Sequence, residues 1–244
     1  MPDIEEVTKG FQLLYQFEEY QIRKSLGFMI IIIGVTNFIA AILQYILFYE
    51  PTDPFKALRI IGNLNLYYYL LLFSTIIPLL LCFFLTILTY FSVKKTTIDE
   101  NGLHFHRYAF LGFALFFMYV FPSALILTPF SQFTVNYLWS GGLGCLISYY
   151  FLKKIVEFKN FKEILYLGLI LIFFASVFMI LYFFDELIDF NWILININFQ
   201  GSYIPFNLGI ISNLFIFLIS YFICGYYLIK KAHLILERDS GFQE

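Results

Sequence analysis

SLGFMIIIIGVTNFIAAILQYILFY, residues 25–49, is a continuous apolar run without Asp, Glu, Lys, Arg or His. A helix needs about 20 mainly apolar residues to cross the hydrocarbon core of a bilayer. Within lipid, only helices and closed barrels satisfy their backbone hydrogen bonds, and this run is too continuous for a barrel strand. We therefore predict that residues 25–49 form a transmembrane helix.

Five further apolar runs follow along the chain, and the composition agrees with a membrane protein. Hydrophobic residues make up 61% of the 244 residues and charged residues 13%, whereas a soluble domain is about 45–50% apolar and about 25% charged. The sequence predicts an all-α integral membrane protein with a six-transmembrane-helix bundle over residues 25–231. The predicted spans are residues 25–49, 66–93, 108–130, 134–152, 162–184 and 205–229, followed by a tail over residues 232–244.

The segment before the first span has the pattern of an amphipathic helix. Ile4, Val7, Phe11 and Leu14 recur at heptad-like spacing, which is typical of a helix with one apolar face. Acidic residues stand at its start and basic residues at its end, an order that complements the helix dipole. We predict an N-terminal cytoplasmic amphipathic helix over residues 1–24, lying along the membrane surface or packing under the bundle.

Lysine and arginine residues collect on one side of this predicted topology. With six spans and the N-terminus inside, only Lys56 and Arg59 of the 15 basic residues lie outside. Cytoplasmic segments of membrane proteins carry an excess of Lys and Arg. The sequence therefore predicts a multi-pass cell-membrane protein with both termini in the cytoplasm and the lipid bilayer as a partner. The net charge of −2 does not suggest a nucleic-acid partner.

The core of every predicted span lacks Asp, Glu, Lys, Arg and His. Intramembrane charges mark proton relays and ion pathways, so their absence disfavours proton-coupled pumps and intramembrane proteases. The three cysteines lie inside apolar segments and have neither metal-ligand nor redox spacing. Because the sequence also contains no phosphate loop and no protease signature, it favours a protein without enzymatic activity, metal or cofactor.

Two asparagines inside the predicted spans are candidates for lining a polar pathway. Asn37 lies in the first predicted span and Asn213 in the sixth. An amide that lacks a hydrogen-bond partner is costly in hydrocarbon, so these side chains need water, substrate or protein partners. The alternative is that they hydrogen-bond within the protein and only stabilise the bundle.

The predicted inner loop of residues 94–107 is the most polar internal connection. We interpret it as a surface that docks a partner protein or binds lipid head groups. A second interpretation is a lipid-modifying enzyme at the inner membrane interface, acting through Asp99 and the two histidines of this loop. The docking or head-group candidates are Lys94, Lys95, His104, His106 and Arg107.

The longest predicted outer connection, residues 185–203, mixes acidic residues with many apolar ones. A solvated loop has no need of so many apolar side chains. We therefore expect a short interfacial or partly re-entrant element, anchored by Trp192 at the membrane surface.

The order of these elements resembles the layout of small ABC-2-type export permeases. Those proteins have a cytoplasmic surface helix, six spans, both ends inside, a docking loop between spans two and three, and a re-entrant element between spans five and six. The resemblance covers the whole chain and rests on layout, without a shared motif. It implies a permease-like membrane subunit of a transport system, with a separate cytoplasmic ATPase subunit docked on residues 94–107 and a pathway at a homodimer interface. The alternative is an accessory or assembly subunit without a pathway of its own.

Overall fold

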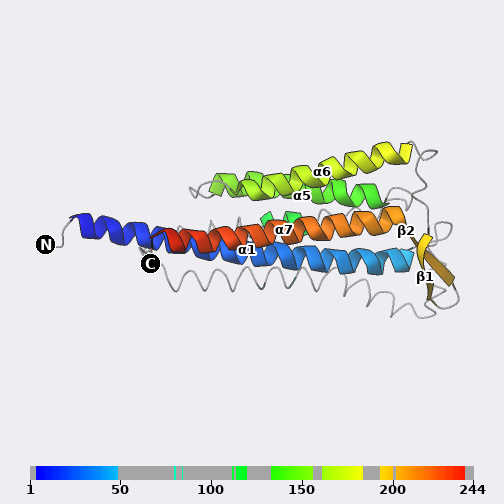
Figure 1. Ribbon diagram of the computed structural model, residues 1–244, viewed down its shortest axis with the longest axis horizontal. Coiled ribbons are helices and arrows are strands. Elements are labelled where there is room, and N and C mark those ends of the chain that lie inside the picture. The colour runs from blue at the N-terminus through cyan, green and yellow to red at the C-terminus, as the bar shows by residue number, and fades with distance from the viewer. Residues whose placement is uncertain are drawn as a thin grey trace.

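The computed structural model describes four long helices and a β-hairpin (Figure 1). The elements are α1 (Ile4–Phe48), α5 (Phe133–Ile155), α6 (Lys162–Phe183), β1 (Ile193–Phe199), β2 (Ser202–Asn207) and α7 (Leu208–Asp239). The described residues are 4–48, 80, 84, 112, 114–119, 133–155, 161–183, 193–199 and 202–239.

The long helices lie side by side with their axes roughly aligned (Figure 1). The N-terminal part of α1 and the C-terminal part of α7 lie at the same end of the bundle, which we call the terminal end, and the hairpin lies at the other. α1 and α7 are antiparallel, because the Tyr20 ring contacts His233 whereas Phe38 contacts Phe215. α5 and α6 also run in opposite directions (Figure 1).

α1 and α7 approach each other closely at a pair of glycines. A Cβ atom built on Gly27 would lie 2.6 Å from the carbonyl oxygen of Gly225, and one built on Gly225 would lie 2.5 Å from that of Gly27. Two turns further along α1, a Cβ on Gly34 would lie 2.5 Å from the Cβ of Tyr221. Small residues at helix interfaces allow such close backbone approach. The sequence thus makes α1 and α7 one tightly packed pair.

α5 and α6 form a second pair in the same way. A Cβ atom on Gly142 would lie 2.9 Å from the carbonyl oxygen of Gly168, and one on Gly168 would lie 3.0 Å from that of Gly142. Contacts within these two pairs are more extensive than those between them. The described bundle is therefore an α1/α7 pair packed against an α5/α6 pair.

Aromatic residues fill the space where α5 meets α7. The ring centroid of Phe217 lies 4.5 Å from that of Tyr137 and 4.4 Å from that of Tyr221. Tyr221 Oη lies 3.4 Å from Sγ of Cys145 and donates a hydrogen bond to the carbonyl oxygen of Met118 at 3.4 Å. All five residues are buried, so this contact forms part of the core between the two pairs.

Three of the described helices are long and apolar enough to cross a membrane, over Glu19–Ile42, Lys162–Leu181 and Leu208–Ile235. Their outer faces carry large exposed hydrophobic residues, among them Phe173 at 63% and Ile223 at 61% exposure. Contiguous apolar surface of this kind marks contact with lipid or with another protein. The apolar helices therefore fit a membrane protein.

The count of six spans stays a prediction. α5 covers the predicted fourth span, residues 134–152, but is not among the three helices that meet the length and hydropathy of a span. Residues 66–93 and 108–130 lie mostly outside the described residues. Of the six predicted spans, three thus correspond to described helices that meet these criteria, and a fourth corresponds to α5, which does not.

A separate N-terminal amphipathic helix over residues 1–24 is not confirmed. α1 continues through residues 24 and 25 without a break and contains 45 residues, which corresponds to about 68 Å at about 1.5 Å per residue. The hydrocarbon core of a bilayer is about 30 Å thick, so a large part of α1 extends beyond a span. No proline separates the polar and apolar parts of α1, and one helix therefore carries both.

The interfacial or partly re-entrant element expected over residues 185–203 stays a prediction, and the described part of this segment is a β-hairpin that we did not expect. β1 and β2 form an antiparallel hairpin in which Phe199 pairs with Ser202, so the described fold is not entirely helical. The alternation Ile195, Asn196, Ile197 has the period of two that suits a strand. Trp192 lies outside the described residues.

Ser148 joins α5 to another segment of the chain, because its Oγ lies 2.6 Å from the carbonyl oxygens of both Ala114 and Gly144. We expect Ser148→Ala to lower the stability by about 0.6 kcal/mol, the average for a hydrogen bond between membrane helices. Thermal unfolding of the protein in detergent measures this. Ser176→Ala is the control, since Ser176 Oγ bonds only Ile172 in its own helix; equal losses in both variants would contradict a contribution from the link.

Candidate functional site

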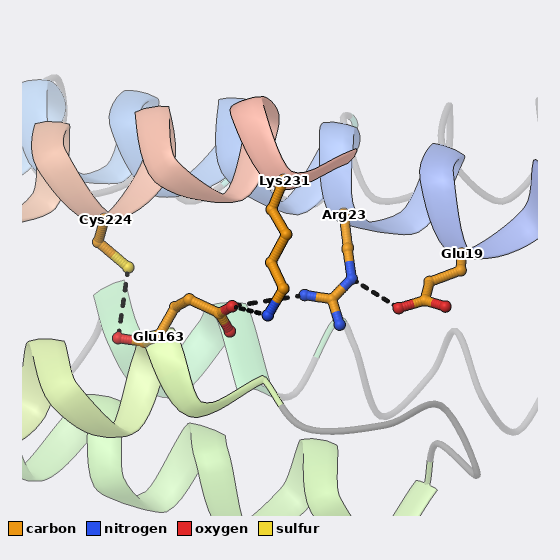
Figure 2. A network of polar contacts seen from close by, with 5 residues as sticks. All are labelled: Glu19, Arg23, Glu163, Cys224 and Lys231. Atoms are coloured by element: carbon orange, nitrogen blue, oxygen red, sulfur yellow. Dashed lines mark hydrogen bonds and ion pairs between the residues drawn. The ribbon is translucent and has the colours of Figure 1, made fainter. Parts of the chain in front are cut away.

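Four ionisable side chains from three helices meet at the start of α6 (Figure 2). Nζ of Lys231 on α7 lies 2.7 Å from Oε1 of Glu163 on α6. Nη1 of Arg23 on α1 lies 3.6 Å from the same oxygen, and Nε of Arg23 donates a hydrogen bond to Oε1 of Glu19 at 2.8 Å. We call Glu19, Arg23, Glu163 and Lys231 the ion cluster.

The centre of the ion cluster is removed from solvent. The side chains of Arg23 and Glu163 are 2% and 7% exposed, whereas that of Lys231 is 41% exposed. Buried charges are costly unless they are paired and hydrogen-bonded. Two cations and two carboxylates make this cluster formally neutral, and the Arg23 guanidinium also lies 4.9 Å from the ring centroid of Phe161, a favourable cation–π distance.

Local helix geometry places each member of the cluster. The backbone N–H of Ile164 donates a hydrogen bond to the carbonyl oxygen of Phe161 at 3.2 Å and closes a turn at the start of α6. Glu163 therefore lies in the first turn of α6. The helix dipole favours a carboxylate there. Glu19 and Arg23 are four residues apart on α1 and therefore share a face. Gly27, one turn beyond Arg23, allows α7 to come close. The cluster thus depends on both the start of α6 and the α1/α7 contact.

Charge is distributed unevenly along the bundle. Every Lys and Arg in the described part of the chain belongs to residues 9–24, 153–155, 161–162 or 230–238, and these segments lie toward the terminal end (Figure 1). The helical segments between them and the hairpin carry no basic residue within the described ranges. An excess of cations is typical of the cytoplasmic end of a membrane protein. This polarity favours the predicted orientation, which stays a prediction.

A groove of ≈ 620 Å³ lies between α6 and α7, and we call it the α6/α7 groove. Lys162, Glu163 and Lys231 line one end of it, and apolar side chains such as those of Ile170 and Ile223 line its walls. Since α6 belongs to one helix pair and α7 to the other, the groove follows the boundary between the pairs. Its charged end includes two residues of the ion cluster.

The predicted pathway residues are both buried, Asn37 at 1% and Asn213 at 2% exposure. Nδ2 of Asn213 donates to the carbonyl oxygen of Gly209 in its own helix at 2.8 Å. Neither asparagine is among the residues that line the α6/α7 groove. Their role in lining a pathway therefore stays a prediction.

The predicted docking residues Lys94, Lys95, His104, His106 and Arg107 lie outside the described residues, as does Asp99. His233, the remaining histidine, lies on α7 with its ring centroid 5.6 Å from that of Tyr20. The docking surface and the enzymatic interpretation of this loop both stay predictions.

The ion cluster was missed by the sequence analysis, which counted Arg23 and Lys231 only as cations near the inner membrane surface. The spacing of Glu19 and Arg23 indicates an ion pair within one helix, and an acid at position 163 beside many cations is a further signal. Neither signal reveals that the partners from different helices meet. That information comes only from how the helices pack.

Comparison with protein-family models, with curated proteins and with solved structures finds no match for this chain. A functional conclusion therefore depends on the ion cluster, on the α6/α7 groove and on the division of the bundle into two helix pairs.

Proposed function

We propose that this chain is a permease-like membrane subunit of a transport system, in which the α1/α7 pair and the α5/α6 pair move relative to each other. The proposal is supported by the position of the groove and of the ion cluster between the two pairs. Glycine contacts hold each pair together internally. Transporters commonly work by rocking one group of helices against another around a site.

The ion cluster supplies a contact that can break and reform in such a movement. Glu163 on α6 is bound by Lys231 on α7 and faces Arg23 on α1, so separating the pairs at the terminal end separates these charges. Because Lys231 is 41% exposed, water can solvate its ammonium group when the contact opens. In the proposed cycle the cluster holds the terminal end closed, and its opening widens the α6/α7 groove.

The proposal carries with it the arrangement that the layout implies. Both termini lie in the cytoplasm, two copies of the chain associate, and a separate cytoplasmic ATPase subunit docks on residues 94–107. ATP binding by that subunit then drives the movement of the helix pairs. We propose the orientation, the dimer and the ATPase partner together with the transport function.

Spin labels on the two walls of the groove test the movement. Tyr166→Cys and Tyr227→Cys place one label on α6 and one on α7, both at exposed positions that line the groove. In proteoliposomes that also contain the co-purified ATPase, we expect ATP to change the label-to-label distance by several ångströms, on the order of the 5 Å shift of one helical turn. Pulsed electron paramagnetic resonance measures this distance.

A label pair within the α1/α7 pair is the control. Phe28→Cys and Phe222→Cys are similarly exposed, and we expect their distance to stay constant because Gly27 and Gly225 hold these helices together. If no ATPase co-purifies, or if ATP leaves the groove distance unchanged, the transport proposal fails. An accessory or assembly subunit without a pathway is then the better account.

A further inference from the structure

We infer that an anionic glycerophospholipid occupies the α6/α7 groove, with its phosphate at Lys162 and Lys231 and one acyl chain along the apolar walls. The groove has a volume of ≈ 620 Å³, within the range of about 300–1,000 Å³ that is typical of small-molecule sites. This site is distinct from the predicted head-group surface of residues 94–107. The proposed lipid site requires that the chain lies in a bilayer, but it does not depend on the proposed transport cycle.

The length of the groove fits one leaflet of a bilayer. Its wall on α6 extends from Lys162 to Phe174 and its wall on α7 from Lys231 to Ile216. These are twelve and fifteen residue steps, about 18 Å and about 22 Å of helix. Half of the hydrocarbon core is about 15 Å, so the groove accommodates an acyl chain and the attached glycerol phosphate, and it ends near the middle of the membrane.

The polarity along the groove follows the order found at a membrane surface. Lys162 and Lys231 stand at the charged end, and Tyr166 and Tyr227 each lie one helical turn deeper, at 56% and 55% exposure. Tyr side chains concentrate where head groups meet hydrocarbon. Beyond the tyrosines the walls are mainly aliphatic. A molecule that matches this order is charged at one end and apolar along the rest.

The charge at this end favours an anion. Lys162 is exposed and makes no ion pair within the described part of the chain. Lys231 uses one hydrogen bond for Glu163 and retains two of the three donors of an ammonium group. With Glu163 already bound by Lys231, the lysines leave an excess of positive charge, and a phosphate complements it.

Lipid binding to the purified full-length chain tests the site. Native mass spectrometry with dioleoylphosphatidylglycerol and dioleoylphosphatidylcholine compares an anionic and a zwitterionic head group on the same acyl chains. We expect Lys162→Gln to weaken phosphatidylglycerol binding about five-fold, the usual effect of one lysine beside anionic lipid. Lys230→Gln is the matched control: Lys230 is exposed on α7 but does not line the groove, and we expect no change.

The apolar wall provides a second and independent variant. Ile223→Trp fills the groove without changing charge, and we expect it to weaken the binding of both lipids. Phe222→Trp introduces the same indole ring at a similarly exposed position outside the groove, and it should leave binding unchanged. Neither variant alters the ion cluster, so a loss of binding does not reflect its disruption.

Three outcomes of these binding measurements would overturn the inference. They are equal affinity for the two lipids, equal loss in the Lys162→Gln and Lys230→Gln variants, and unchanged binding in Ile223→Trp. A photoreactive amino acid at position 223 in native membranes adds a direct test, since adducts with lipid support the site and adducts with another protein or a second copy contradict it. If lipid binds but the helix pairs do not move, the proposed lipid site stands and only the transport proposal fails.

Discussion

Gly225→Leu is expected to separate α1 from α7 and to lower the thermal stability of the purified protein by roughly 10 °C. Even a Cβ atom at position 225 would lie 2.5 Å from the carbonyl oxygen of Gly27 and 2.6 Å from Cγ1 of Ile31. Backbone cannot move aside as a flexible side chain can, so the helices must shift. Overpacking of this kind costs about 3 kcal/mol, which corresponds to roughly 10 °C for a domain of this size.

The control for this prediction is Gly10→Leu in α1. A Cβ atom at Gly10 meets nothing within 4 Å, and replacing a glycine in a helix interior with leucine gains up to about 1 kcal/mol. We expect this variant to melt at the wild-type temperature or slightly above it. If the Gly225→Leu variant also melts at or above the wild-type temperature, α1 and α7 are not in contact at Gly27. The ion cluster one turn away then loses its structural basis as well.

The helices were predictable from sequence where one physical requirement fixes their length. The span predicted over residues 162–184 corresponds to α6, Lys162–Phe183, because only a run of about 20 apolar residues crosses a bilayer. The boundary predicted at residue 24 does not exist in α1. A polar amphipathic helix and an apolar span have the same backbone geometry, so a change of polarity does not end the helix.

The hairpin had a signal in the sequence that was misinterpreted. Ile195, Asn196 and Ile197 alternate in polarity, and only two residues, Gln200 and Gly201, separate Phe199 from its partner Ser202. Period-two alternation before a short connection containing glycine predicts a β-hairpin. The apolar composition of this segment predicted an interfacial or partly re-entrant element and gave no indication of strands.

The candidate site could not be derived from sequence in the same way. Arg23 lies two residues before an apolar run, where a cation ordinarily interacts with lipid head groups at the membrane surface. What buries it is the packing of three helices, brought together by Gly27 against Gly225 and by Phe161 over the guanidinium. Such meetings between distant segments depend on tertiary structure and leave no local pattern in the chain.

Arg23→Met is expected to destabilise the protein by about 2 kcal/mol, the scale of a lost hydrogen bond to a charged group, because Glu163 keeps its closer partner Lys231. The variant leaves Glu163, 7% exposed, with Lys231 as its remaining cationic partner, and it removes the contact with the Phe161 ring. Chemical or thermal unfolding in detergent measures the loss. Lys153→Met is the control, because Lys153 is an exposed cation on α5, and its removal should change stability by less than about 0.5 kcal/mol.

Arg23→Lys distinguishes the geometry of the cluster from its charge. Arg23 contacts two acids through different nitrogens, Nε on Glu19 and Nη1 near Glu163. A lysine ammonium is a compact point charge and cannot reproduce this planar arrangement of donors. We therefore expect Arg23→Lys to restore only a small part of the stability that Arg23→Met loses. Full restoration would mean that any cation at this position suffices, and the guanidinium would then not bridge α1 and α6 as the structure has it.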